Sequence, residues 1–475
     1  MSGALWSADE VAAATGGKAS GGHGGGDWSV VGISIDSRTV LPGELFIALR
    51  GPKHDGHRFV SAALARGAAC LVDTVSAKLG DTAPLIKVAD TMEALTALGR
   101  AARLRSSAKV TAITGSVGKT GTKEALRLAL APQGATHASV QSFNNHWGVP
   151  LSLARAPRHA VYEIYELGMN APGEIADLAR LVRPEVALIT TIAPAHLGHF
   201  PSVDAIAEAK AEIFQGLMPG GMAVLDRDNP YFLALKERAL AGDCGRVISF
   251  GEKSDADARL LASRLQADGS DVRMALDGVE LRYRVGAPGR HWVKNSLAVV
   301  AIAAALGADP ERAGEALVEL KPPKGRGQRH KIERADGVVE VIDESYNANP
   351  ASMRAAISLL ESSRGRRIVA LGDMLELGEQ SAQFHAELAE PLAECKVDRV
   401  FTVGSAMRHL HAALPKDRRG IHVEQAKSLV PILVSELAAG DTILVKGSLG
   451  SAMGQVVEAL LAEDPFERTP FEGRG

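Results

Sequence analysis

The pattern of apolar and polar positions along the chain predicts an α/β protein. Runs rich in Val, Ile and Leu that end in small or polar residues are typical of buried strands. Four such runs, over 110–114, 161–166, 186–191 and 222–225, alternate with segments of helical spacing. This alternation favours a doubly wound parallel sheet, which we expect to form a central domain over 107–323.

The same alternation resumes after a basic, Pro- and Gly-rich segment, K-P-P-K-G-R-G-Q-R at 321–329. Strands are predicted over 338–343, 367–371, 399–403 and 442–446, with helices from Pro350, Ser381 and Gln425 and a final helix. We therefore expect a C-terminal Rossmann-like domain over 324–475, joined to the central domain by a hinge at 321–329.

The N-terminal part predicts a third, smaller α/β domain over 1–106. Ser7 and Glu10 form a capping-box pattern at the start of a helix. A strand is expected near 30–35 and a helix over 91–105, with the basic stretch 100–109 as the linker to the next domain. A chain of 475 residues is too long for one core, so three domains are the natural expectation.

Composition excludes several classes of partner. The chain has 53 Lys and Arg against 56 Asp and Glu, a net charge of −3, which gives no electrostatic case for nucleic acid or a membrane. The longest apolar run, 297–306, is too short to span a bilayer, and no secretory signal follows Met1. The three cysteines are far apart and lack CxxC spacing, which is typical of reduced thiols. We expect a cytoplasmic protein and, by default, a monomer.

One stretch predicts a nucleotide site. Residues 109–123 read K-V-T-A-I-T-G-S-V-G-K-T-G-T-K: a strand, a turn with Gly115 and Gly118, and a helix that opens with Lys119 and Thr120 and runs to about residue 131. Backbone N–H groups and the helix dipole would face a phosphate, the Lys would neutralise it, and the Thr hydroxyl could bind Mg²⁺. The general P-loop has a glycine where Ile113 stands. The structural alternative to a nucleotide site is an ordinary glycine turn between a strand and a helix. The alternative function is that of a P-loop kinase or a nucleotide-binding switch.

Further polar residues are expected near this loop. Glu166 ends an apolar strand, His196 follows the next one, and Lys210 lies on the helix after it. Because ligands of open α/β sheets bind at the carboxyl ends of strands, these groups are a plausible Mg²⁺ shell. Ser37 and Arg38 lie where a strand ends in a turn. Arg38 could bind a diphosphate or make a surface ion pair, and spacing does not separate the two.

Motifs along nearly the whole chain resemble the Mur ligases, the ATP-dependent amide-forming enzymes of peptidoglycan precursor synthesis. They are T-G-S-V-G-K-T (114–120), N-N-H-W-G-V-P-L (144–151), E-L-G (166–168), A-H-L (195–197), A-K-A-E-I (209–213), D-E-S-Y-N-A-N-P (343–350), L-G-D-M-L-E-L-G (371–378) and V-K-G-S (445–448). The short P-loop of that family accounts for Ile113. The last three motifs are most similar to the branch that joins D-alanyl-D-alanine to UDP-N-acetylmuramoyl-tripeptide.

The resemblance implies roles for individual residues. For ATP it implies Thr114, Gly115, Ser116, Val117, Gly118, Lys119, Thr120 and Gly121, with Asn295 at the adenine, Arg326 at a phosphate, and Asp343 or Glu344 at the ribose. For two Mg²⁺ ions it implies Thr120, Glu166, His196 and Lys210, the lysine being carbamylated. The implied catalytic residues are Lys119, Lys210, His196, Glu166 and Arg326. For the other substrates it implies Ser37 and Arg38 at the UDP part, and Asn144, Asn145, Tyr346, Asn347, Asn349, Lys446 and Ser448 elsewhere.

Two positions depart from the family pattern. Leu449 stands where an Arg is usual, which leaves the dipeptide contact open, and Trp147 stands where a smaller or acidic residue is usual. The implied reaction passes through an acyl phosphate, with closure of the C-terminal domain. Another Mur-type ligase or a folylpolyglutamate synthetase is the nearest alternative. The sequence does not distinguish diaminopimelate from lysine at the third peptide position.

Overall fold

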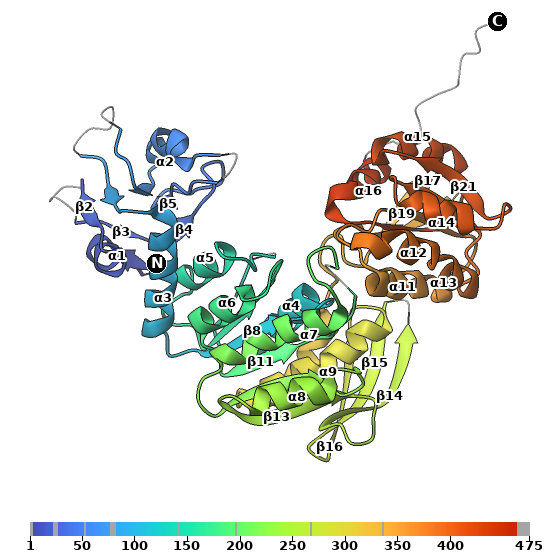
Figure 1. Cartoon of the computed structure of the whole chain (residues 1–475), viewed down its shortest axis with the longest axis horizontal. Helices are drawn as coiled ribbons and strands as arrows, with labels where there is room; N and C mark the ends of the chain where they lie inside the picture. The colour runs from blue at the N-terminus through green and yellow to red at the C-terminus, as the bar shows by residue number, and fades with distance from the viewer. Residues whose placement is uncertain are drawn as a thin grey trace, which may run out of the picture.

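A computed structural model describes residues 3–21, 27–51, 54–76, 82–140, 142–194, 197–266, 268–334 and 337–462 of the chain. Within these residues three α/β units follow one another, each built on its own large sheet. In Figure 1 the N-terminal unit (blue) and the C-terminal unit (orange to red) lie on two sides of the central unit. The three-unit α/β fold predicted from the apolar pattern is confirmed.

The N-terminal unit has a mixed sheet in the order β2-β7-β6-β5-β4. Its strands are β2 (Lys18–Ser20), β4 (Gly32–Ser34), β5 (Glu44–Ile47), β6 (Ala69–Val72) and β7 (Leu85–Lys87), and a separate pair joins β1 (Trp6–Ser7) to β3 (Ser29–Val30). Its helices are α1 (Ala8–Thr15), α2 (Val60–Ala65) and α3 (Thr91–Arg105). The capping box of Ser7 and Glu10 is present, whereas the single strand predicted near 30–35 is divided between β3 and β4.

A shared core joins the N-terminal unit to the central one. Leu151 and Ala154 of α5 (Gly148–Ala154) pack in the same cluster as the N-terminal strands. Trp6 donates its indole N–H to the carbonyl oxygen of Ala154 at 2.9 Å. Trp147 packs against this cluster and lies edge-on to Phe143 at 5.2 Å between ring centroids. Trp147 therefore has a packing role at the junction of the two units.

The central sheet has the order β16-β15-β14-β13-β12-β11-β8-β10-β9. Its strands are β8 (Lys109–Thr114), β9 (Thr136–Ala138), β10 (Tyr162–Glu166), β11 (Val186–Ile189), β12 (Gly221–Asp226), β13 (Cys244–Gly251), β14 (Ala258–Gln266), β15 (Gly269–Leu276) and β16 (Val279–Val285). Its helices, besides α5, are α4 (Lys119–Leu130), α6 (Glu174–Val182), α7 (Val203–Ala211), α8 (Phe232–Leu240), α9 (Arg290–Ala305) and α10 (Pro310–Ala316).

The prediction of a parallel sheet is confirmed for β8 to β13 and for the pairing of β13 with β14, but it is wrong for the two pairs beyond β14. β14, β15 and β16 pair antiparallel, as two hairpins on the edge of the sheet. The second hairpin turns at Asp277 and Gly278, both of which have positive φ (47° and 87°). Asp-Gly is the sequence preferred in such two-residue turns, so this hairpin had a readable signal.

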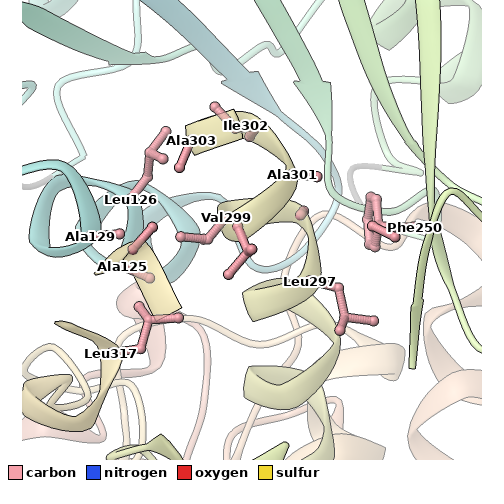
Figure 2. Close-up of a cluster of buried hydrophobic side chains, with 14 of the residues drawn as sticks. Ala125, Leu126, Ala129, Phe250, Leu297, Val299, Ala301, Ile302, Ala303 and Leu317 are labelled. Atoms are coloured by element: carbon pink, nitrogen blue, oxygen red, sulfur yellow. The ribbon is translucent and has the colours of Figure 1, made fainter. Parts of the chain in front are cut away.

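The apolar run at 297–306 forms the centre of the main core. It belongs to α9, which packs against α4 and the sheet, and Figure 2 shows Leu297, Val299 and Ile302 of α9 among Leu126, Ala129 and Phe250. A helix that is apolar on all sides is buried in a large core. Among the described residues, no helix is both long and apolar enough to cross a membrane.

The C-terminal sheet has the order β17-β18-β22-β19-β20-β21, with β17 antiparallel and the others parallel. Its strands are β17 (Gln328–Arg334), β18 (Gly337–Glu344), β19 (Arg367–Gly372), β20 (Arg399–Val403), β21 (Arg419–Val423) and β22 (Thr442–Lys446). Its helices are α11 (Pro350–Ser358), α12 (Ser381–Ala386), α13 (Ala389–Glu394), α14 (Met407–Ala413), α15 (Ala426–Glu436) and α16 (Gly454–Leu461). The predicted hinge is shorter than expected, because Gln328 already begins β17.

The core of α9 generates a stability prediction. Leu297 is fully buried, so Leu297→Ala should cost about 2–5 kcal/mol through lost burial and a cavity. The unfolding midpoint should fall clearly in a thermal or urea melt. Leu233→Ala on α8, where the side chain is 65% exposed, is the matched control and should leave the midpoint nearly unchanged. Equal midpoints for the two variants would contradict this account of the core.

Candidate active site

One cavity of about 460 Å³ lies between the central and C-terminal units. From the central unit it is lined by Ser116, Val117, Gly118, Lys119, Thr120, Gly121, Ser142, Asn144, Asn145, Glu166, Gly168, Met169, Asn170, Glu174, Lys210, His291, Trp292 and Asn295. From the C-terminal unit it is lined by Gly325, Arg326, Glu344, Tyr346, Asn347, Ala348, Asn349, Ser352, Leu375, Glu376, Lys446, Ser448, Leu449 and Gly450. Most of the residues predicted for ATP and substrate are thus brought together.

The P-loop forms as the sequence predicts. Gly118 is the N-cap of α4 with φ 88° and without a side-chain capping bond, and it lines the cavity together with the first residues of α4, Lys119, Thr120 and Gly121. At Gly115 (φ 146°) a Cβ would lie 1.9 Å from the Thr190 hydroxyl, so only glycine fits. Free N–H donors at a helix N-terminus suit a phosphate. Thr114 lies outside the cavity lining and donates its hydroxyl to the carbonyl of Leu167 at 2.9 Å.

Lys119 is folded back on the loop. Its Nζ donates to the carbonyl oxygen of Gly115 at 2.6 Å. Burial lowers the pKa of Lys119, the Glu166 carboxylate opposes this shift, and the Arg326 guanidinium adds to it. An anionic ligand in the cavity would favour the charged form of Lys119.

Glu166 is the carboxylate at the centre of the site. It ends β10, is buried, and accepts hydrogen bonds from the Thr120 hydroxyl at 2.8 Å and from the Asn144 amide at 2.8 Å. Gly168 leaves room for Asn144, since a Cβ at Gly168 would lie 2.8 Å from the amide of Asn144. A hydroxyl and a carboxylate oxygen at this spacing fit a hard cation such as Mg²⁺.

The rest of the predicted metal shell is only partly described. In the described residues no group of three or more His, Cys, Asp or Glu side chains could hold a metal ion. His196 lies outside the described residues. Lys210, on α7, lines the cavity and is 1% exposed. Burial, and then the charge of Lys119, hold the pKa of Lys210 well below its usual value, so its neutral amine is favoured.

The start of α9 packs directly on the P-loop. A Cβ on Gly118 would lie 3.0 Å from the Asn295 amide nitrogen, and a Cβ on Gly121 would lie 2.7 Å from the Trp292 ring. Asn295 therefore lines the cavity beside the P-loop, and its contact with adenine stays a prediction. His291 and Trp292 also line the cavity and were not predicted, although both stand in the H-W-V-K-N segment that contains Asn295.

The hinge contributes Arg326 to the site. Its guanidinium lies 4.2 Å from the ring centroid of Tyr346, and its Nη2 is 3.5 Å from the Ser142 hydroxyl of the central unit. Asp343 and Glu344, the two candidates for a ribose contact, differ in position. Asp343 is buried and accepts hydrogen bonds from the backbone N–H groups of Gly325 and Ser345, both at 3.1 Å, whereas Glu344 lines the cavity. The geometry favours Glu344.

Several predicted substrate residues already have structural partners. Lys446 is buried, pairs with Glu344 at 3.2 Å and donates to the carbonyl of Asn347 at 2.9 Å. Ser448 accepts from the N–H of Leu375 at 2.9 Å. Asn349 caps α11 through the N–H of Ser352, and Asn145 accepts from the N–H of Gly148 at the start of α5. These residues line the cavity, and their hydrogen bonds also stabilise the segments that form its walls.

Ser37 and Arg38 are not part of this cavity. They follow β4 in the N-terminal unit, and the Arg38 side chain is 86% exposed and pairs with Asp36 at 2.7 Å. The hydrogen bonds from Arg38 lower the pKa of Asp36 to about 2. The surface ion pair left open by the sequence is therefore present, and the contact with UDP stays a prediction.

Three sequence profiles match the chain in order. They are described as "Mur ligase family, catalytic domain" at 29–103, "Mur ligase middle domain" at 113–303 and "Mur ligase, glutamate ligase domain" at 325–449. A UDP-N-acetylmuramoyl-tripeptide–D-alanyl-D-alanine ligase of Escherichia coli (strain K12) is 35% identical over 438 residues, 92% of this chain and 95% of that protein. The chain belongs to the Mur ligase family.

Two solved MurF structures share the fold over nine-tenths or more of this chain. A MurF structure from Acinetobacter baumannii superposes with a TM-score of 0.83 at 31% identity, over 96% of this chain and 98% of that one. MurF of Thermotoga maritima in complex with ADP has a TM-score of 0.75 at 25% identity, over 90% and 96%. Mur ligases are ATP-dependent enzymes that form amide bonds, and this chain matches the family in all three of its units.

The P-loop geometry generates a test of Lys119. Lys119→Ala should remove a charge-assisted contact with a phosphoryl group and lower the rate of ATP-dependent turnover by about 10²–10⁴-fold. Circular dichroism should stay native, because Lys119 borders a cavity and not the apolar core. Lys236→Ala, at an exposed position of α8, is the control. A native spectrum with an unchanged rate would place the ATP site elsewhere.

Proposed function

We propose that this Mur ligase joins D-alanyl-D-alanine to UDP-N-acetylmuramoyl-tripeptide, with ATP as the energy source. The observation that carries the proposal is the shared cavity, where the P-loop of the central unit meets the two polar segments of the C-terminal unit, 343–350 and 371–378. The relatives that match over nine-tenths of the chain bear the name of this activity. The nucleotide substrate and the three buried free cysteines support a cytoplasmic location.

The chemistry follows from the weakness of a carboxylate as an electrophile. The terminal carboxylate oxygen of the tripeptide attacks the γ-phosphorus of ATP, and ADP leaves with its bridging oxygen. The free amine of D-alanyl-D-alanine then attacks the acyl carbon, and phosphate leaves as the amide forms. The first step brings two anions together, and in the second the neutral amine attacks an anionic acyl phosphate and gives up a proton as phosphate leaves. Cationic side chains and hydrogen-bond donors at the phosphate are therefore the main contribution of the protein.

The residues of the cavity divide this work. The N-terminal turn of α4 would hold the β- and γ-phosphates, Lys119 would leave Gly115 to neutralise them, and Arg326 would reach the same phosphates from the hinge. Thr120 and Glu166 would hold Mg²⁺, which supplies charge neutralisation for phosphoryl transfer. Glu344 is favoured over Asp343 at the ribose because it faces the cavity.

The N-terminal unit is assigned to the UDP part of the substrate. We divide the chain at 1–106, 107–323 and 324–475, because the α3–β8 and hinge segments lie between separate sheets. The UDP site would lie near Ser37 and Arg38, with Arg38 released from Asp36 when it meets a diphosphate. Two Mg²⁺ ions and a monomeric state stay part of this proposal.

The acceptor amine is the first experiment. Phosphate release with UDP-muramoyl-tripeptide and ATP should require D-alanyl-D-alanine, and diaminopimelate, lysine and glutamate should not replace it. Omission of the tripeptide is the control and should abolish release. Comparable turnover with a single amino acid would favour another Mur-type or folylpolyglutamate-type ligase, and turnover without any amine would favour a kinase or a nucleotide-binding switch.

Lys210 provides the second experiment. Burial lowers the pKa of its amine, and the neutral amine can attack CO₂, lose a proton and become a carbamate, whose oxygens suit Mg²⁺. Lys210→Ala should therefore abolish activity, and short carboxylic acids in solution should partly restore it. Acidification should lower the activity of the wild-type enzyme, since protonation of the Lys210 amine prevents carbamate formation. Full activity of Lys210→Ala without added acid would exclude this role, and Lys236→Ala with the same acids is the control.

A further inference from the structure

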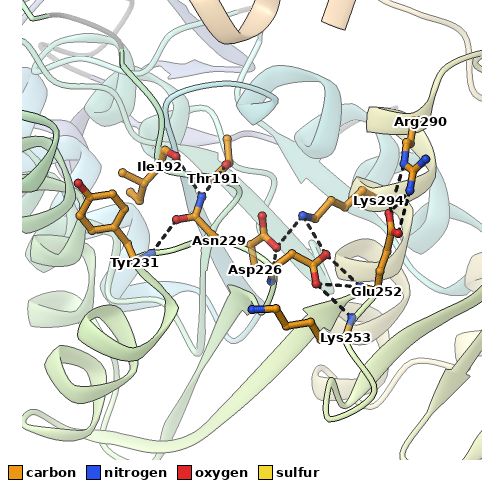
Figure 3. A network of polar contacts seen from close by, with 10 residues as sticks. Thr191, Ile192, Asp226, Asn229, Tyr231, Glu252, Lys253, Arg290 and Lys294 are labelled. Atoms are coloured by element: carbon orange, nitrogen blue, oxygen red, sulfur yellow. Dashed lines mark hydrogen bonds and ion pairs between the residues drawn. The ribbon is translucent and has the colours of Figure 1, made fainter.

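A chain of polar contacts runs beside the cavity without lining it. Figure 3 shows two groups of such contacts, Asn229 with Thr191 and Ile192, and Lys294 with Asp226. The backbone N–H of Asn229 donates to the carbonyl oxygen of Asp226 at 3.3 Å and joins the two groups. The mechanism above uses none of these side chains. Lys294, however, is the residue immediately before Asn295 on α9.

Lys294 is held between two carboxylates. Its Nζ lies 2.8 Å from Asp226, the last residue of β12, and 3.1 Å from Asp228 in the following turn. The side chain of Asp226 is only 6% exposed, and that of Lys294 is 29% exposed. A partly buried pair of this kind fixes geometry more firmly than a surface pair, because removal of one partner leaves a desolvated charge.

The Asp226–Asp228 turn is itself tied to the P-loop. Asn229 donates its amide to the Thr191 hydroxyl and to the Ile192 carbonyl, both at 3.0 Å. Thr191 in turn accepts, through its carbonyl oxygen, from the N–H of Ser116 in the P-loop at 2.9 Å. The contacts therefore lead from the P-loop through β11 and β12 to α9.

The path closes at Asn295. The Asn295 amide packs on Gly118, so that a Cβ there would be 3.0 Å away, and both residues line the cavity. The P-loop and the turn of α9 that carries Asn295 are thus joined by one closed ring of contacts. Lys294 is the link that fixes the turn of α9 on which Asn295 stands.

We propose that Lys294 is a positioning residue that sets base selectivity: clamped by Asp226 and Asp228, it places the Asn295 amide to recognise adenine. This proposal rests on the proposed function, in which Asn295 meets the base. An amide can donate to N7 of adenine and accept from its 6-amino group, whereas guanine presents two acceptors there. A displaced Asn295 would lose this discrimination while the phosphate cradle stays intact.

The test is calorimetry of ADP and GDP binding to the full chain, which needs neither tripeptide nor amine. Lys294→Met should weaken ADP about tenfold, the loss of one good hydrogen bond, and leave GDP nearly unchanged. Lys294→Arg, which keeps the charge between the two carboxylates, should restore most of the ADP preference. In turnover, KM for ATP should rise about tenfold, whereas kcat and KM for the tripeptide should change less than about twofold.

Two further variants separate positioning from stability. Arg290→Met removes an exposed ion pair with Glu252 one turn earlier on α9, and should keep the preference for ADP. Lys294→Met with Asp226→Asn removes the lysine charge together with that of its more buried partner and leaves only the more exposed Asp228, so it should regain most of the wild-type melting temperature without regaining the preference. The double variant also allows the preference for ADP to be measured if Lys294→Met alone folds poorly.

Several results would overturn the proposal. The first is a wild-type ratio of ADP to GDP affinity in the stable double variant. The second is an equal loss of ADP and GDP affinity in Lys294→Met, and the third is the same loss of ADP affinity in Arg290→Met. Failure of the proposed function looks different. If wild type bound ADP with these preferences but used another amine, the acceptor assignment would fall and the role of Lys294 would stand.

Discussion

The arrangement of this site depends on positive charge held away from water. Lys119 and Arg326 line one cavity beside the buried carboxylate of Glu166, and burial together with the charge of Arg326 lowers the pKa of Lys119. Like charges in a medium of low polarity are unfavourable unless an anion joins them. The cavity is therefore built for polyphosphate, and the rigid parts around it keep the cations from moving apart.

That rigidity comes from the central sheet and α9. The apolar side chains of α9 fix its axis against α4, and the close contacts at Gly118 and Gly121 fix its first turns against the P-loop. A larger residue at either glycine would separate the two helices. The same packing that stabilises the core thus sets the distance between the two ends of the nucleotide site, which links stability to function in one element.

Much of this was readable from the sequence, and the failures have physical causes. The parallel strands, the P-loop and α3 follow from local patterns, because a buried strand and a capped helix have strong local signals. The antiparallel extension β14–β16 was missed because its edge strands are only half buried and carry many exposed polar residues. Their apolar pattern is therefore weaker than that of the buried parallel strands. His291 and Trp292 were missed as lining residues because their approach to the P-loop depends on tertiary packing. Asn349 and Asn145 were predicted as substrate contacts, and their capping bonds show that a motif residue can hold the wall of a site.

The two outer units are attached to the centre in different ways, and this difference bears on how the site works. The N-terminal unit shares a buried core with α5, and Arg103 of α3 donates to the carbonyls of Val182 and Arg183 in the central unit at 2.7 and 2.8 Å. Among the described residues, the polar contacts of the C-terminal unit with the central one are fewer: Arg326 with Ser142 at 3.5 Å, and the N–H of Gly198 with the Glu376 carbonyl at 2.7 Å. Because the short segment 321–327 connects these two units and each supplies about half of the cavity wall, rotation there would open the site without unfolding either sheet. The reacting groups would then meet only when nucleotide phosphates draw Arg326 and Lys119 together, which couples closure of the site to the charge that it is built to bind.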